Sequence, residues 1–220
     1  QVIDNSTAPE GYVLSKYGDV HFSKDESKLY FGLAKPPIEK DTTLLKEEIV
    51  NVEVWTYDEP RLYTVQELQL KNDSIRSFKT AYHIDTKKTV PIANTTFMNT
   101  ELGDEGNAKV ALINTSMPYE LPSQWTGRRE YDYQAIDTQT GEKRFGFKQV
   151  PRMGLSPKAA YAFGYSRVDS TWFTYNLNSG AYKALTKDEI FFNEQNDYPN
   201  YPSAYGVAGW TKDDKALIIY

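Results

Sequence analysis

Internal repetition is the sequence feature that most restricts the fold. Three segments share an aromatic-rich run, an Asp or Asn turn and a second run: TAYHIDTKKTVPI (80–92), EYDYQAIDTQTGEKRF (130–145) and TWFTYNLNSGAYKAL (171–185). The turn residues Asp85, Asp137 and Asn176 lie 52 and 39 positions apart. Asp and Asn side chains accept hydrogen bonds from the backbone two residues on, which favours tight turns. Each segment is therefore predicted to be a β-hairpin.

A second repeated element precedes these hairpins. It has an apolar residue, Ser or Thr, a polar turn and a strand, as in HFSKDESKLYF (21–31), GLSPKAAYAF (154–163) and GWTKDDKALII (209–219), with LGDEGNAKVALI (102–113) as an intervening copy. Two hairpins in every repeat of about 40–55 residues are typical of a β-propeller blade. Trp210 holds the place that Phe22 and Leu155 hold in their repeats. Equivalent positions in repeats generally pack alike, so Trp210 is expected to be a core residue of its blade.

The predicted fold is all-β. Residues 1–220 form a partial β-propeller of four-stranded antiparallel blades, about three blades plus part of a fourth, with an insertion at about 35–77. The helical periodicity is weak, and the best candidates are TLLKEEIV (43–50) and LTKDEIFFN (185–193). The alternative for the first is a polar loop with a few apolar anchors, because short isolated helices are marginal.

Composition excludes several classes of function. The formal net charge is −5, with 25 basic and 30 acidic residues and no Lys/Arg cluster, which argues against nucleic-acid binding. No apolar run approaches the roughly 18–20 residues that span a bilayer. Cysteine is absent, which excludes disulfides, thiolate nucleophiles and zinc–thiolate sites. The chain begins without a signal-peptide pattern, so either a signal has been removed or the chain is excised from a longer protein. The strand-like run ALIIY at its end favours excision.

Several stretches resemble the β-propeller region of bacterial prolyl-oligopeptidase-like (S9-type) serine peptidases. They are FSKDESKLYFG (22–32), NVEVWTYDEPRLYTVQ (51–66), SQWTGRREYDYQAIDTQTGE (123–142), GLSPKAAYAFGY (154–165) and NDYPNYPSAYGVAGWTKDDKALIIY (196–220), the last being the most specific. The resemblance implies that an α/β-hydrolase domain, absent from this chain, lies after the propeller and carries a Ser-Asp-His triad. It also implies that the propeller covers the active-site mouth and filters peptides, in a bacterial protein of the periplasm or the extracellular medium.

The chain itself offers little for catalysis. No Gly-x-Ser-x-Gly elbow is present, and the nearest match, around Ser156, is better explained as a blade turn. The two histidines, His21 and His83, stand beside apolar residues in expected strands, where a structural role is the simpler interpretation. Paired acids occur at Glu47–Glu48, Asp104–Glu105 and Asp213–Asp214, and they fit turns better than a glycosidase site. We expect no catalytic, metal-binding or cofactor-binding residues, and no cofactor.

Exposed aromatic side chains are the best candidates for binding. The chain has 17 tyrosines and four tryptophans, which either pack between blades or form peptide- or sugar-binding surfaces. The loop NDYPNYPSAYG (196–206) suits a surface that faces a partner or substrate. Candidate residues for such a surface are Tyr198, Tyr201, Tyr205, Trp125 and Arg128.

Two classes of function remain open. In the first, the propeller gates or orients peptide substrates for a hydrolase domain outside this chain. In the second, it is a stand-alone scaffold, of the TolB-like or WD-like kind, that binds protein or glycan. The two classes differ in the sequence expected after Tyr220: a hydrolase region with Gly-x-Ser-x-Gly, or further blades.

The isolated chain is predicted to have no peptidase or esterase activity. The reason is that no serine lies in an elbow and that only two histidines, His21 and His83, are available as a base. Chromogenic prolyl and alanyl substrates provide the assay. Hydrolysis that survives repurification and disappears when one serine of the chain is mutated would refute this prediction.

Overall fold

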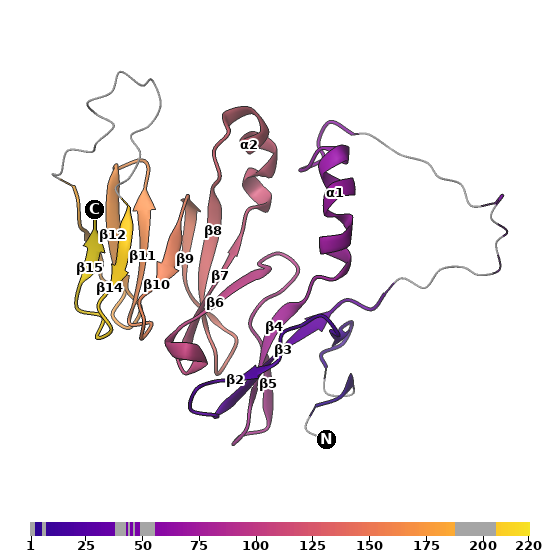
Figure 1. The fold of residues 1–220 in the computed structure, drawn as a ribbon, viewed down its shortest axis with the longest axis horizontal. Helices are drawn as coiled ribbons and strands as arrows, with labels where there is room; N and C mark the ends of the chain where they lie inside the picture. Colours follow the sequence, from indigo (N-terminus) through magenta and orange to yellow (C-terminus); the bar gives the residue numbers. More distant parts are fainter. Residues whose placement is uncertain are drawn as a thin grey trace.

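A computed structural model describes residues 3–5, 8–37, 43, 45, 47–48, 56–187 and 206–220 of the chain. In these residues, successive antiparallel sheets lie next to one another in chain order (Figure 1). They are the blades of a partial β-propeller, and the described residues form three blades and two strands of a fourth. The all-β propeller fold predicted from the repeats is therefore present.

The first strand of blade 1 is divided into two short strands, β1 (Val13–Leu14) and β2 (His21–Phe22). The blade continues with β3 (Lys28–Ala34), β4 (Phe78–His83) and β5 (Lys88–Pro91). Both β1 and β2 pair with β3, which pairs with β4, and β4 pairs with β5. Gly18 lies between β1 and β2, where an added Cβ would stand 2.6 Å from the Cα of Gly32 in β3. This close approach of two backbones requires glycine.

The later blades have the same order of strands from one edge to the other. Blade 2 consists of β6 (Asn99–Leu102), β7 (Val110–Thr115), β8 (Tyr131–Asp137) and β9 (Lys143–Val150). Blade 3 consists of β10 (Met153–Leu155), β11 (Tyr161–Ser166), β12 (Thr171–Asn176) and β13 (Tyr182–Ala184). Blade 4 is described by β14 (Val207–Trp210) and β15 (Leu217–Ile219). The hairpins at Asp85, Asp137 and Asn176 therefore lie in three successive sheets, as predicted.

The outer hairpins close by the chemistry that the sequence indicates. Asp137 Oδ1 accepts hydrogen bonds from the backbone N–H groups of the second and third residues after it, at 2.8 and 3.1 Å, and Asn176 Oδ1 does the same at 2.9 Å for both. Gly141 and Gly180 then adopt φ of +79° and +75°. A residue with a Cβ would be strained at these two positions.

The first hairpins of the four blades share one backbone conformation in their turns. The third residue after Ser23, Gly103, Ser156 and Thr211 has a positive φ in every case: these residues are Glu26, Gly106, Ala159 and Asp214. Glu47–Glu48 and Asp213–Asp214 lie in turns, as the sequence predicts, whereas Asp104–Glu105 lie in a short 3-10 helix, η2 (Asp104–Gly106). We refer to the end of the sheets that carries these first turns as the turn end.

Aromatic and β-branched side chains fill the space between blades. Tyr30 of blade 1 packs with Ile113 and Ile136 of blade 2, and all three are buried. Tyr133 of blade 2 shares a second cluster with Phe173 of blade 3. A third cluster, which contains Trp172, joins blade 3 to the strands of blade 4. Much of the aromatic content is therefore used for packing.

Phe22, Leu155 and Trp210 occupy the same position in their blades but differ in burial. Leu155 is buried between blades 2 and 3. Trp210 is half-buried against blade 3, where its ring stacks on Tyr161 with centroids 5.9 Å apart. Phe22, in contrast, is 56% exposed. Leu155 and Trp210 pack against the preceding blade, whereas Phe22 lines a pocket with Leu102 and Glu105 of the following blade.

Residues 35–77 connect β3 to β4 and contain α1 (Tyr63–Ser74), a helix that the sequence did not predict. No side chain caps its start, and none of its residues is buried, so neither capping nor an apolar face indicates it in the sequence. The helix expected at 43–50 falls largely outside the described residues. The one expected at 185–193 lies outside them beyond Lys187, and Leu185–Lys187 are not helical. The connection from β7 to β8 contains a second short helix, α2 (Glu120–Thr126).

Asp214 joins blade 4 to blade 3 at the turn end. Its carboxylate accepts hydrogen bonds from Ser156 Oγ at 2.6 Å, from the Lys158 N–H at 3.0 Å and from the Ala160 N–H at 3.3 Å. The residue is 7% exposed. Loss of this partner would lower the free energy of unfolding, because no water replaces the carboxylate at a buried donor.

We predict that Asp214→Ala lowers the free energy of unfolding by about 2–4 kcal/mol, because it leaves these donors unsatisfied and puts Ala at a left-handed φ of +60°. Denaturant melts measure the change. Asp213→Ala is the matched control, since its ion pair with Lys215 is largely exposed and such pairs contribute about 0–1 kcal/mol. Equal losses in the two variants would contradict the prediction.

Candidate functional site

The helices α1 and α2 lie at the same end of the sheets, opposite the turn end (Figure 1). Both belong to connections between the second and third strands of neighbouring blades. Because adjacent blades are stacked side by side, long connections at equivalent places meet. We refer to this end as the insertion end. Between the two connections is a cavity of about 430 Å³, which we refer to as the first cavity.

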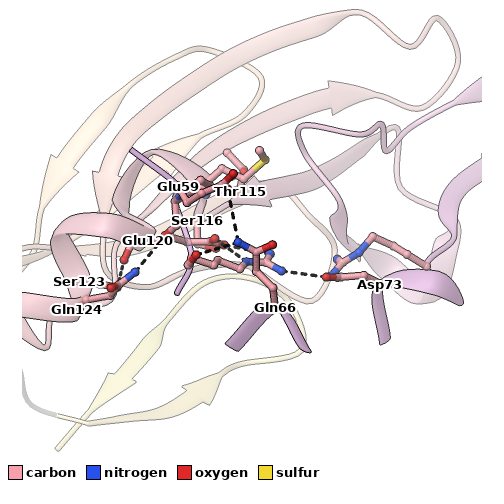
Figure 2. Close-up of polar contacts among 12 residues, drawn as sticks. Glu59, Gln66, Asp73, Thr115, Ser116, Glu120, Ser123 and Gln124 are labelled. Carbon is pink, nitrogen blue, oxygen red and sulfur yellow. Dashed lines mark hydrogen bonds and ion pairs between the residues drawn. The ribbon is translucent and has the colours of Figure 1, made fainter. Parts of the chain in front are cut away.

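Arg61 bridges the two connections that line the first cavity. Its Nε donates to Glu120 Oε2 at 2.7 Å, and its Nη1 donates to Asp73 Oδ2 at 3.0 Å. Glu120 begins α2 and Asp73 lies near the end of α1, so one guanidinium contacts both helices. Figure 2 shows these contacts around Glu120 and Asp73. A planar guanidinium that donates in several directions suits this role better than an ammonium group.

The two carboxylates of this bridge are held by further donors. Ser116 Oγ donates to Glu120 Oε1 at 2.9 Å, and Arg76 Nη2 donates to Asp73 Oδ1 at 2.6 Å (Figure 2). The hydrogen bond to Glu120, more than the opposing burial, raises the pKa of Arg61 above its ordinary value. Burial disfavours the ionised form of Asp73, but the Arg76 hydrogen bond and the nearby Arg61 outweigh it and lower the pKa of Asp73.

Amide side chains hold the backbone just before α1. Gln66 Nε2 donates to the Arg61 carbonyl oxygen at 2.9 Å, and Gln124 Nε2 donates to the Pro60 carbonyl oxygen at 3.2 Å. Figure 2 labels both Gln66 and Gln124 among these polar contacts. The segment that carries Arg61 is thereby fixed against α2. The first cavity thus has walls joined by ion pairs and neutral hydrogen bonds.

This arrangement supports binding better than catalysis. Arg61 is paired with both Glu120 and Asp73, and paired charges are poor nucleophiles and bases. Among the hydrogen bonds of the described residues, none joins a histidine ring to a serine hydroxyl. His83 Nε2 lies 2.7 Å from the Thr138 carbonyl oxygen, and His21 stacks on Tyr30 at the turn end. In the described part of the chain, no group of three or more His, Cys, Asp or Glu side chains is arranged to hold a metal ion.

The predicted binding residues fall in different places. Trp125 lies on α2 and is 86% exposed, at the insertion end. Arg128 lies just after α2 and lines a second cavity of about 390 Å³, between blades 2 and 3. Tyr198, Tyr201 and Tyr205 lie outside the described residues. The structure therefore places Trp125 and Arg128 on one end of the sheets.

Sequence reasoning missed the Arg61–Glu120 bridge. The partners are 59 positions apart and belong to connections between strands, where no periodicity signals a contact. The stretch DEPRLY around Arg61 lies within the resemblance described above, but its composition does not distinguish it from an exposed loop.

Comparison with protein-family models gives no match, and comparison with curated proteins gives none either. Among the described residues, no helix has both the length and the apolar character needed to cross a bilayer.

Glu120→Gln is predicted to loosen the contact between α1 and α2. It keeps the shape of the side chain but removes the charge that Arg61 contacts, and half-buried charged hydrogen bonds contribute about 1.5–3 kcal/mol. Amide hydrogen exchange in 61–76 should become faster. Glu67→Gln, an exposed carboxylate on α1, is the matched control and should change nothing. Unchanged exchange in Glu120→Gln would show that the bridge does not hold the helices.

Proposed function

We propose that this chain is the non-catalytic propeller segment of an S9-type serine peptidase of the periplasm or the extracellular medium. In this proposal it gates or orients peptides for a hydrolase domain outside the chain. The support from the sequence is the resemblance in the blade motifs. The support from the structure is the insertion end, where two connections build a cavity that is walled by paired charges.

The observation that carries the proposal is the exposed apolar surface on the helices of the insertion end. Val65 and Leu68 of α1 and Leu121 and Trp125 of α2 are all exposed. Large apolar side chains that gather at one end of a molecule mark surfaces covered by a partner or ligand. In the proposal, peptides and the hydrolase domain cover this surface.

The role of the insertion end in this proposal is positioning. A wall held by Arg61 and Glu120 presents a fixed shape to a peptide, and a fixed shape lowers the entropy lost on binding. Bond cleavage then belongs to the triad of the domain outside the chain. The described residues contribute binding and access.

A stand-alone scaffold is the second candidate. The observation that favours it is Trp125, since an exposed indole beside an amide, Gln124, also suits protein or glycan contacts. Reading the coding sequence past the codon for Tyr220 separates the two candidates. A strand followed by Gly-x-Ser-x-Gly supports the peptidase, and further blade repeats followed by a stop codon support the scaffold.

Peptide binding at the insertion end is tested by fluorescence anisotropy with a labelled, uncharged, proline-containing peptide with capped ends. Trp125→Ala is predicted to weaken binding about 5-fold or more, because exposed aromatic anchors dominate such contacts. Phe22→Ala is the matched control, as an exposed aromatic at the turn end. Binding of maltose- or cellulose-derived oligosaccharides without peptide binding would favour the glycan scaffold.

A further inference from the structure

The second cavity has a different character from the first. It lies at the insertion end between blades 2 and 3 and has a volume of about 390 Å³. Three basic side chains line it, Arg128, Lys148 and Arg167, against two acidic ones, Glu130 and Asp169. A local excess of positive charge stands out in a chain of net charge −5.

A β-bulge in β9 brings Lys148 to this cavity. Tyr131 pairs with Val150 and Tyr133 with Phe147, so Asp132 faces two residues of β9, Lys148 and Gln149. Gln149 has a φ of +56°, which is unfavourable for a residue with a side chain. Its N–H donates to Asp132 Oδ1 at 3.1 Å, which stabilises the bulge. Bulges commonly redirect side chains beside functional sites.

The acidic residues of the cavity have partners within the protein. Glu130 accepts a hydrogen bond from Gln149 Nε2 at 2.8 Å and lies 3.4 Å from Arg167 Nη1. Asp169 accepts one from Ser166 Oγ at 2.9 Å. Within the part of the chain that the structure describes, no carboxylate forms an ion pair with Lys148. Lys148 is also exposed, so its ammonium group is available to a ligand.

An aromatic pair lines the same cavity. Tyr182 is half exposed and stacks on the buried Phe173, with ring centroids 5.3 Å apart. Val150, which is also buried, completes this apolar wall. A ligand that fits has a negative group for Lys148 and an apolar group for Tyr182. A peptide carboxylate beside an apolar side chain has this chemistry.

We propose that the second cavity binds a peptide carboxylate, with Lys148 as the cationic group and Tyr182 on Phe173 as the apolar wall. The carboxylate belongs to an Asp or Glu side chain or to the free C-terminus of the peptide. This inference rests on the proposed function in that the ligand is a peptide, and it adds the charge that the peptide carries.

The test uses fluorescence anisotropy with three labelled peptides that share a Phe beside the variable position. The first has Glu and an amidated C-terminus, the second has Gln and an amidated C-terminus, and the third has Gln and a free C-terminus. At about 50 mM salt, we expect a carboxylate-bearing peptide to bind about 5- to 10-fold more tightly than the neutral one, and about 300 mM salt should reduce this advantage. The stronger of the first and third peptides identifies the source of the carboxylate.

Lys148→Gln is expected to remove most of this advantage and to leave the affinity for the neutral peptide unchanged. Lys143→Gln is the matched control, an exposed lysine at the other end of β9. Equal affinity of the wild-type chain for all three peptides overturns the inference, and this comparison does not depend on how any variant folds. A similar loss in Lys143→Gln also overturns it. If the neutral peptide binds without any carboxylate preference, the proposed peptide-binding function stands and this inference fails.

Discussion

A buried ammonium group joins the first two blades, and the arrangement of the insertion end depends on such joints. Lys28 is 5% exposed, and its Nζ donates to the carbonyl oxygens of Gly106 and Asn107 in the first turn of blade 2, at 3.2 and 2.8 Å. Burial lowers the pKa of Lys28, because desolvation disfavours the charged form. Tyr30 adds a hydrogen bond to the same Gly106 oxygen at 2.7 Å. A buried polar group must keep its partners, so these contacts favour one placement of blade 2 against blade 1.

The other joints at the turn end use different groups for the same purpose. Between blades 2 and 3, the Asp104 N–H donates to the Pro157 carbonyl oxygen at 2.9 Å, and between blades 3 and 4, Asp214 contacts the turn at Ser156. Each joint involves the first turn of the later blade. With one end of the stack fixed in this way, the connections at the opposite end are brought side by side, and both cavities arise there.

The fold was predictable because its signals are local and repeated. The side chains of Asp137 and Asn176 bond to backbone N–H groups two residues further along the chain. The strands between such turns are rich in aromatic and β-branched residues, which can be recognised without knowing the strand that pairs with them. The site was much less predictable. Arg61 and Glu120 meet across 59 positions, α1 has no side-chain cap and no buried residue, and the bulge at Gln149 depends on Asp132 in another strand. Composition and resemblance indicate Trp125 and Arg128 as binding candidates. The exposure of Trp125 and the position of Arg128 in the second cavity depend on the placement of α2.

The blade repeat, the chemistry of its turns and the absence of a nucleophile elbow can all be read from the amino-acid sequence, because each is a property of residues close together in the chain. Which side chains meet between blades depends instead on the tertiary structure. Phe22 and Trp210 occupy the same place in their repeats, yet Trp210 is half-buried against blade 3 and Phe22 is exposed. Lys148 and Arg167 likewise share a cavity because blades 2 and 3 are stacked. Burial and pairing are properties of neighbours in space, and in a propeller those neighbours come from the adjacent blade.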